Sequence, residues 1–136
     1  MLFELATPAR MLISADVEEV VAPGTEGYFG VWPGHAPFLT TLGSGEVCYK
    51  MGRDEKCLAV SGGFAEVTGE RVIILAESAE LPEEIDVARA QRAKQRAELR
   101  LSGKSPLCTP EDIDYTRAIA AFERATARLM TAGRLS

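Results

Sequence analysis

The sequence is poor in the side chains that most often build catalytic and metal sites. It has one histidine, His35, one tryptophan and three cysteines, with no C-x-x-C pair among them. A single imidazole argues against a multi-histidine metal site and leaves a Ser-His triad to rest on one residue. The odd cysteine count argues against a disulfide framework or a zinc site and favours a reducing compartment. We therefore expect a chain that is not an enzyme by itself, requires no cofactor and holds no metal.

Long apolar runs are also missing. No run is longer than the five residues of Val72 to Ala76, which is far shorter than the roughly 18 residues needed to cross a bilayer. The N-terminus enters an alternating pattern without a basic region or a long apolar segment, so the sequence shows no signal peptide. We expect a cytoplasmic protein without direct membrane insertion.

Charge divides the 136-residue chain into two parts. Residues 1–85 contain 14 acidic and 5 basic side chains, whereas residues 86–136 contain 6 acidic and 10 basic ones. The architectural boundary falls near Leu81 and Pro82. Because phosphate backbones attract basic surfaces, the acidic first part argues against nucleic acid as a partner. The basic second part should instead seek an acidic protein surface or a phosphate.

Glycine-rich turns in the first part separate short apolar or alternating runs, a pattern typical of strands. Because the chain has no asparagine, the positive-φ positions of these turns fall almost wholly on glycine. Eight or more short strands without intervening helices predict a β-sandwich or flattened barrel. The expected strands are Leu2–Ala6, Arg10–Ile13, Val17–Val21, Gly27–Trp32, Glu46–Met51, Lys56–Val60, Phe64–Val67 and Val72–Leu75.

The second part has a helical period. Small residues recur at helical spacing from Ala90 to Leu101, Asp86 stands where it can cap this helix, and Ser102-Gly103 ends it. A second helix is expected to start at Thr109-Pro110, because a hydroxyl N-cap and a first-turn proline are typical helix starts. Two antiparallel helices with alanine seams bury little apolar area. The composition of these two helices is equally compatible with a hairpin that moves and with one that stays fixed on the sandwich.

One stretch, Gly30 to Leu42, is less generic than the rest. It holds the only tryptophan and the only histidine, and two prolines with Gly34 make its turn stiff. A stiff turn that carries an aromatic ring and an imidazole can serve as a docking surface, because little order has to be gained on binding. A cross-over between two sheets with a hydrogen-bonded core histidine explains the same residues.

A second candidate is a set of arginines on the two expected helices. Arg89 follows Asp86 by three residues, and Arg96 lies two turns further on. Arg124 and Arg128 stand at i and i+4 on the second helix. If the helices fold back on each other, these guanidinium groups would converge on an anionic ligand such as a nucleotide phosphate. Arginines at this spacing on an exposed helix more often only aid solubility.

Five segments carry a family resemblance and cover most of the chain. They are Gly30–Pro37 (G-V-W-P-G-H-A-P), Leu42 with Gly45, Val60–Val67 (V-S-G-G-F-A-E-V), Leu75–Glu77 with Ala79-Glu80, and Ile85–Ala90 (I-D-V-A-R-A). In this order they resemble the epsilon subunit of the rotary F-type ATP synthase of bacteria. The resemblance implies a ten-stranded N-terminal β-sandwich over residues 1–84, followed by a C-terminal antiparallel two-helix hairpin over residues 85–136.

The family places the sandwich at the cytoplasmic face of the bacterial inner membrane, where it binds the central gamma subunit and the membrane-embedded c-ring. Carried over by position, the resemblance assigns this contact to His35, the turn around it and the adjoining loop. The implied contact residues are Tyr28, Phe29, Trp32, His35, Pro37 and Leu42.

The hairpin of this family lies folded on the sandwich or extends along gamma toward the catalytic alpha and beta subunits, where it blocks ATP hydrolysis. The Ile85–Ala90 segment matches a motif that in some members binds ATP in the folded hairpin, as a regulatory ligand that this chain does not hydrolyse. The resemblance therefore implies a central-stalk rotor subunit that couples the catalytic head to the c-ring and regulates it. By position the ATP-binding residues are Glu80, Ile85, Asp86, Arg89, Ala90, Arg96, Arg124 and Arg128.

Two other functions compete with this interpretation. The first is a free-standing nucleotide-sensing module that uses the same arginines outside any complex, which predicts ATP binding without co-purification with gamma. The second is an enzyme that uses His35 as an acid or base, which predicts lost turnover in His35→Ala with assembly intact.

Overall fold

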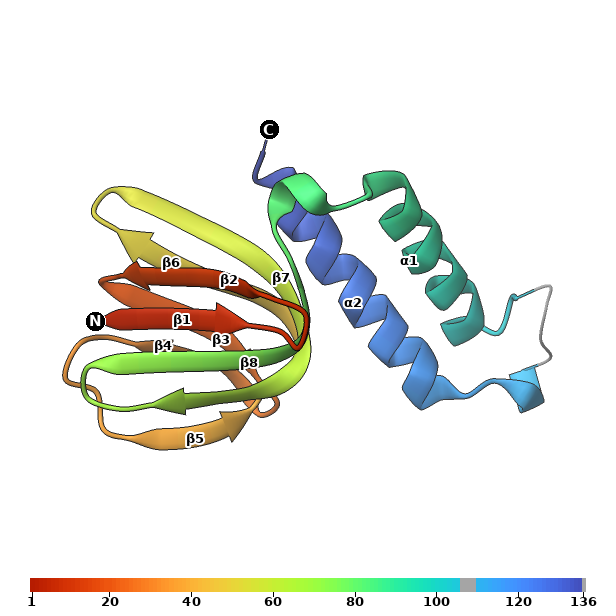
Figure 1. Cartoon of the computed structure of the whole chain (residues 1–136). Coiled ribbons are helices and arrows are strands. Elements are labelled where there is room, and N and C mark those ends of the chain that lie inside the picture. The colour runs from red at the N-terminus through yellow and green to blue at the C-terminus, as the bar shows by residue number, and fades with distance from the viewer. Residues whose placement is uncertain (106–109, 136) are drawn as a thin grey trace.

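The computed structural model describes residues 1–105 and 110–135 and shows a β-sandwich with two helices at one end of it (Figure 1). Two short 3-10 turns, η1 (Pro82–Glu84) and η2 (Pro110–Asp112), precede the helices. Among these residues, no helix is both long and apolar enough to cross a membrane. The strands are β1 (Leu2–Ala6), β2 (Met11–Asp16), β3 (Glu19–Gly24), β4 (Gly27–Val31), β5 (Phe38–Thr41), β6 (Ser44–Met51), β7 (Asp54–Val67) and β8 (Arg71–Glu80), and the helices are α1 (Val87–Leu101) and α2 (Tyr115–Gly133).

Hydrogen bonds join the strands in the order β2-β1-β8-β7-β6-β3-β4, with β5 paired to β7. The pairs are antiparallel except β1 with β8, which run parallel with Leu2 opposite Arg71. The long β7 connects the two sides of the sandwich. Its first half pairs with β6 and its second half with β5, while β8 pairs with it from Ala59 to Val67.

A pair of glycines allows β7 to bend between these halves. Gly62 and Gly63 have positive φ angles of 70° and 109°, a region that residues with side chains rarely adopt. A Cβ atom on Gly63 would lie 2.0 Å from the carbonyl oxygen of Leu75 on β8, so only glycine fits there. The two glycines thus bend a continuous strand, and the expected division into Lys56–Val60 and Phe64–Val67 is wrong.

The sandwich and the two C-terminal helices are as expected, but the described residues form eight strands instead of ten. β7 has 14 residues and β8 has 10. Each of them is as long as two short strands, which accounts for the lower number. β5 was not expected, because Phe38–Thr41 is short and directly follows Pro37.

The apolar core of the sandwich is complete without the helices. Phe3, Leu5, Leu58 and Ile74 are fully buried in it. As far as the chain is described, the core cluster contains no residue of α1 or α2. Because apolar burial is the main favourable term in folding, the sandwich should fold without the hairpin.

Each helix begins at an aspartate. The side chains of Asp86 and Asp114 accept hydrogen bonds of 3.0 Å and 3.1 Å from the backbone N–H three residues further on, which satisfies a first-turn donor. Asp86 is the cap that the sequence predicts. The expected start of the second helix is wrong, because residues 110–112 form the turn η2 and α2 begins only at Tyr115. Thr109, the expected cap, lies outside the described residues.

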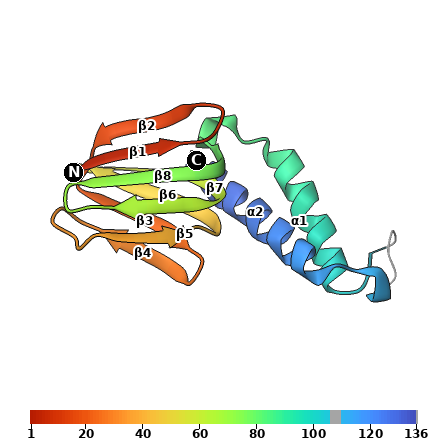
Figure 2. The same ribbon diagram turned by 60° about the horizontal axis from the view of Figure 1, so that its bottom comes forward.

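Helix α2 lies between the sandwich and α1, as Figures 1 and 2 both show. Its buried residues fall on two faces. Ala118 and Ala125 lie two turns apart on the face toward α1, and Ala127 and Thr131 lie one turn apart on the face toward β6 and β7. Because an alanine methyl buries little apolar area, other contacts must contribute to the docking of α2.

Candidate functional site

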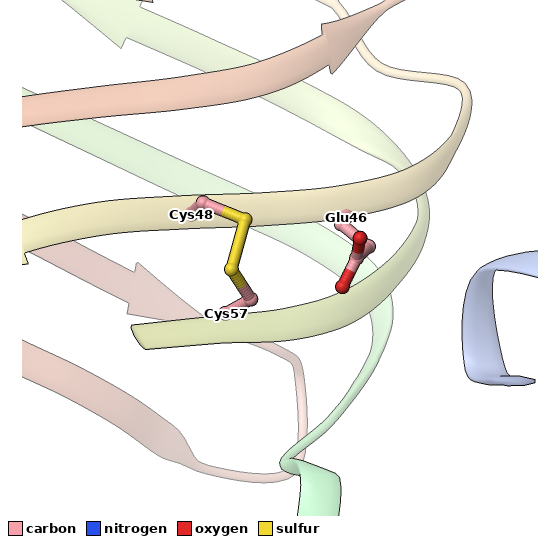
Figure 3. A group of neighbouring side chains, drawn as sticks. All are labelled: Glu46, Cys48 and Cys57. Atoms are coloured by element: carbon pink, nitrogen blue, oxygen red, sulfur yellow. A yellow bond between two sulfur atoms is a disulfide. The ribbon is translucent and has the colours of Figure 1, made fainter. Parts of the chain in front are cut away.

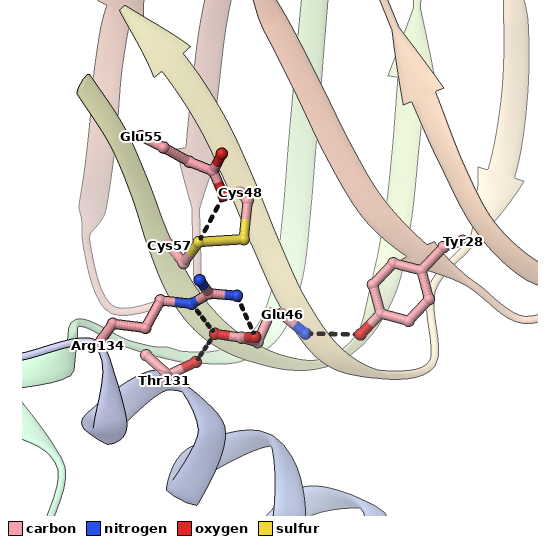
Figure 4. Close-up of a disulfide and its surroundings, with 7 residues drawn as sticks. All are labelled: Tyr28, Glu46, Cys48, Glu55, Cys57, Thr131 and Arg134. Carbon is pink, nitrogen blue, oxygen red and sulfur yellow. Dashed lines mark hydrogen bonds and ion pairs between the residues drawn. A yellow bond between two sulfur atoms is a disulfide. The ribbon is translucent and has the colours of Figure 1, made fainter. Parts of the chain in front are cut away.

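A buried carboxylate fixes the end of α2 to the sandwich. Glu46 on β6 is 3% exposed and stands opposite Ala59 of β7, whose small side chain leaves room for it. Its Oε2 atom accepts hydrogen bonds from the Thr131 hydroxyl (2.7 Å) and from Arg134 Nε (3.0 Å), and its Oε1 atom accepts one from Arg134 Nη2 (3.0 Å) (Figure 4). A buried carboxylate needs such partners to offset its lost hydration. The network of Glu46, Thr131 and Arg134 therefore favours docked α2.

Arg134 remains partly hydrated in this network. Its hydrogen bonds to Glu46 and the negative charge of Glu46 raise the pKa of the guanidinium above its ordinary value, so the group stays cationic. Its side chain is 46% exposed, and water therefore weakens the ion pair. The contact holds the helix end without fixing it permanently.

A second ion pair lies further back along α2. Arg128 donates a hydrogen bond to Glu80 at the end of β8, and their side chains are 35% and 32% exposed. Arg124, one helical turn earlier, joins them in lining a small pocket. The other lining residues are Ala59, Val60, Ser61 and Ser78. Two guanidinium groups beside two hydroxyls are typical ligands of phosphate oxygen atoms. In this structure, however, Arg128 is paired with the Glu80 carboxylate, and the cavity of about 10 Å³ has room for only one water-sized molecule.

The other five predicted ATP-binding residues lie between Ile85 and Arg96, outside that pocket. Ile85 and Ala90 are buried, and Asp86 caps α1. The two arginines, Arg89 and Arg96, are exposed. The structure thus brings together the predicted residues of β8 and α2 but leaves the arginines of α1 exposed.

The predicted gamma and c-ring contact residues do not all belong to one surface. Trp32 is 53% exposed and Pro37 is also exposed, as a docking turn requires. Leu42 is only 4% exposed and belongs to the core, so it supports the turn from inside. Tyr28 is 59% exposed, and its hydroxyl accepts a 3.1 Å hydrogen bond from the backbone N–H of Glu46, which places it beside the network at the end of α2 (Figure 4).

His35 is part of a small aromatic cluster. Its ring lies 5.2 Å from that of Phe38, which lies 5.2 Å from the ring of Phe29. Its Nδ1 atom is 2.7 Å from the carbonyl oxygen of Ala36. No carboxylate or hydroxyl pairs with this imidazole in residues 1–105 and 110–135, so the geometry of a catalytic triad is not formed there. These contacts stiffen the turn instead.

An apolar patch of Leu39, Phe64 and Leu75 lies on the outer face of the sandwich. The three side chains are 69%, 44% and 43% exposed. Phe64 stands opposite Leu75, and Leu39 lies diagonally across from Phe64 on β5, so all three share one face. Adjacent exposed apolar side chains are typical of a protein contact surface.

A disulfide joins Cys48 of β6 to Cys57 of β7 (Figure 3). The antiparallel register sets the two residues directly opposite each other. The odd cysteine count argued against a disulfide framework, but it does not exclude this one pair. Three cysteines can form one disulfide and leave over Cys108, which lies outside the described residues. One carboxylate oxygen of Glu46 and both sulfur atoms lie within 4.8 Å of one another, as in a metal site. The S–S bond and the hydrogen bonds of Glu46 account for this grouping.

Reasoning from the sequence missed Glu46, Thr131 and Arg134 as a functional set. The available signal was the position of Glu46, an acid between Gly45 and Val47 in an expected strand. Its partner Arg134 lies 88 residues further along the chain, and no pattern in the sequence pairs two residues at such a separation.

Two family descriptions together match nearly the whole chain. Residues 1–82 match the family described as ATP synthase, Delta/Epsilon chain, beta-sandwich domain, and residues 83–133 match ATP synthase, Delta/Epsilon chain, long alpha-helix domain. The ATP synthase epsilon chain of Koribacter versatilis is 51% identical over 104 residues, which are 76% of this chain and 73% of that protein. The ATP synthase epsilon chain 2 of Syntrophotalea carbinolica is 50% identical over 103 residues, which are 76% of this chain and 75% of that protein.

Two solved structures share the fold. One is a chain of the Euglena gracilis mitochondrial ATP synthase, with a TM-score of 0.77, 24% identity, and coverage of 98% of this chain and 80% of that one. The other is a chain of the central stalk and c-ring of the Tetrahymena thermophila mitochondrial ATP synthase, with a TM-score of 0.58, 15% identity, and coverage of 98% and 94%.

Proposed function

Because this chain belongs to the epsilon-chain family of the ATP synthase and is a non-catalytic rotor subunit of the central stalk, we propose that its sandwich couples gamma to the c-ring and that its hairpin restrains ATP hydrolysis. The complex would lie at the cytoplasmic face of a bacterial inner membrane. The observation that carries the regulatory role is the polar attachment of α2, in which Glu46 accepts hydrogen bonds from Thr131 and Arg134.

The sandwich offers two surfaces for its partners. The apolar patch of Leu39, Phe64 and Leu75 suits the gamma subunit, because its exposed side chains would be buried on binding. The turn with Trp32 and His35 suits the c-ring, because it is exposed and already stiff. Leu42 would act only indirectly, by supporting this turn from the core.

The attachment of α2 suits a reversible arm. Two ion pairs hold the helix, Glu46 with Arg134 and Glu80 with Arg128, and the arginine of each pair is at least one third exposed. The core cluster of the sandwich includes neither helix within the described parts of the chain. Release would therefore cost little apolar burial and would leave the sandwich folded. The freed basic helices could then reach the catalytic alpha and beta subunits.

ATP would act as a regulatory ligand of the docked hairpin. The pocket that Glu80, Arg124 and Arg128 line contains parts of both the sandwich and α2, so it exists only in the docked state. A ligand that binds one of two states shifts the population toward that state. Bound ATP would therefore disfavour the extended, inhibitory hairpin. To hold it, the cavity of about 10 Å³ would have to widen, and the exposed Arg89 and Arg96 would have to turn toward it.

Adding the chain back to an ATP synthase that lacks this subunit tests the proposal. A variant that ends at Asp86 should still co-purify with gamma and restore coupling, because its core is intact, but it should no longer restrain ATP hydrolysis. The full chain should do both. A truncated chain that binds gamma but cannot couple, or one that still inhibits, would contradict this division of labour.

A further inference from the structure

We propose that Cys48 and Cys57 form a thiol–disulfide exchange site whose oxidised state stabilises the docked hairpin. The site would react with a dithiol reductant, the class of molecule that reverses protein disulfides. The inference rests on the proposed function for the reducing compartment and for the consequence of undocking, whereas the exchange and the docking are both properties of the isolated chain.

The position of the bond argues against a purely structural role. Cys48 and Cys57 are only 9 residues apart and lie on strands that the hydrogen bonds of a hairpin already pair. A cross-link over so short a loop removes little entropy from the unfolded chain compared with a longer one. The proposed location at the cytoplasmic face of the membrane is a reducing compartment, where a disulfide is more often a redox sensor than a staple.

The two sulfur atoms differ in access. Cys57 is 5% exposed, whereas Cys48 is partly exposed and lines an open groove together with Tyr28, Met130 and Arg134. An attacking thiolate has to approach the sulfur atom that it bonds to. The groove therefore directs the reductant to Cys48.

A dithiol would reduce the Cys48–Cys57 disulfide in two steps. A thiolate of the reductant bonds to Cys48 Sγ while the disulfide breaks, and the electron pair of that bond leaves on Cys57 Sγ, which takes up a proton. The second thiol of the reductant then displaces Cys48 as a thiolate, which is also protonated. Two electrons and two protons pass to the chain, and the reductant becomes a disulfide.

The exchange site is next to the contact that holds α2. Cys48 and Glu46 are alternate residues of β6 and share one face, with Cys57 and Ala59 opposite them on β7. Figure 4 shows the disulfide beside the hydrogen bonds from Arg134 to Glu46. Reduction frees both cysteine side chains to rotate under the last turn of α2, while the hydrogen bonds between β6 and β7 remain. The reduced chain should hold α2 less firmly.

The test uses the full chain with Cys108→Ser, which removes the third thiol. Oxidised glutathione should protect both remaining thiols from alkylation, and dithiothreitol should free both under native conditions. Hydrogen exchange at residues 127–134 should then become several-fold faster, while exchange in β1 and β8 stays unchanged. The variant with Cys48→Ser and Cys57→Ser should not respond to either reagent. In single variants, a maleimide should label Cys48 faster than Cys57.

Three results would overturn the proposal. The thiols could stay free in oxidised glutathione, the bond could open only in denaturant, or the oxidised and reduced chains could exchange equally at residues 127–134. Each of these measurements is made without gamma or the catalytic subunits. A negative result for the exchange site can therefore be distinguished from a loss of coupling or of ATPase inhibition in the reassembled complex.

Discussion

The carboxylate of Glu46 accepts two hydrogen bonds from the guanidinium of Arg134, a residue 88 positions later in the chain. This contact joins β6 of the sandwich to the end of the last helix. Because Glu46 is buried and Arg134 is half exposed, the pair holds α2 in place while water retains access to one partner.

The Glu46 carboxylate should contribute measurably to the docking of α2. In Glu46→Gln the charge is lost but the size of the side chain is kept, so Arg134 loses a charged acceptor. We expect docking to weaken by about 1–2 kcal/mol, the range for a hydrogen-bonded charge with one hydrated partner. Hydrogen exchange in the last two turns of α2 measures the change.

A matched control is Glu4→Gln. Glu4 also pairs with an arginine, Arg71, but on the surface of the sandwich away from the helices. This variant should leave the exchange of α2 unchanged. Equal effects of both variants on α2 would mean that the loss of any acidic side chain is sufficient, and the docking role of Glu46 would be wrong.

Gly63 should be irreplaceable in the bend of β7. Its φ is 109°, and an added Cβ would lie 2.0 Å from the carbonyl oxygen of Leu75. We expect Gly63→Ala to lower the melting temperature and the free energy of unfolding by at least about 2 kcal/mol. In Gly69→Ala no atom lies within 4 Å of the added carbon, so this control should unfold like the parent chain.

Arg124 should be needed for nucleotide binding. If its charge-assisted contact to phosphate is buried, Arg124→Ala should weaken ATP binding at least about tenfold, which corresponds to roughly 1.4 kcal/mol. Isothermal titration of the isolated chain measures this. Arg92→Ala, which removes an exposed arginine of α1, should leave the affinity unchanged. Unaltered binding in both Arg89→Ala and Arg124→Ala would dismiss the site.

Glu84 in the linker before α1 should titrate at unusually low pH. The side chain of Arg10 donates to its Oε1 atom (2.7 Å), and the backbone N–H of Leu81 does the same (2.9 Å). Both contacts hold the pKa of Glu84 below its ordinary value, the first more strongly than the second. Since the folded pKa is lowered, this contribution to stability is present above about pH 4.3 and is lost as the pH falls through the folded value.

A carbon NMR titration of the Glu84 carboxyl group checks this expectation. In Arg10→Ala its pKa should rise toward that of a free glutamate, and the part of the acid-induced loss of stability that comes from Glu84 should shrink, because the folded and unfolded pKa values approach each other. Arg53→Ala, which removes an exposed arginine between β6 and β7, should not change it. A normal Glu84 titration in the parent chain would contradict the assigned cause.

The local features of the fold could be predicted because their causes are local. Alternation and glycine turns located most strands, and the aspartate at position 86 located the start of α1. The start of α2 was placed too early, because Pro110 and the acids after it suit a 3-10 turn as well as a helix. Gly62 and Gly63 were interpreted as a turn, because a sequence shows that a backbone bends but not whether pairing continues through the bend.

The candidate site depends on long-range register, which single-sequence patterns do not contain. Glu80, Arg124 and Arg128 were predicted together only through the family resemblance, and the structure brings these three to one pocket. The disulfide was missed because Cys48 and Cys57 become opposite only once β6 and β7 pair. Leu42 was assigned to the contact surface only by its position in the family resemblance, although its side chain turns into the core.

The parallel pairing of β1 with β8 has a consequence for synthesis on the ribosome. β1 is the first strand to leave the exit tunnel, but its partner β8 is the last strand made, with Leu2 opposite Arg71. Such distant pairing forms slowly and late, so the sandwich can close only while the helical segment is already being translated. Nascent chains halted before residue 80 should therefore remain sensitive to protease, and chains halted well beyond it should resist digestion.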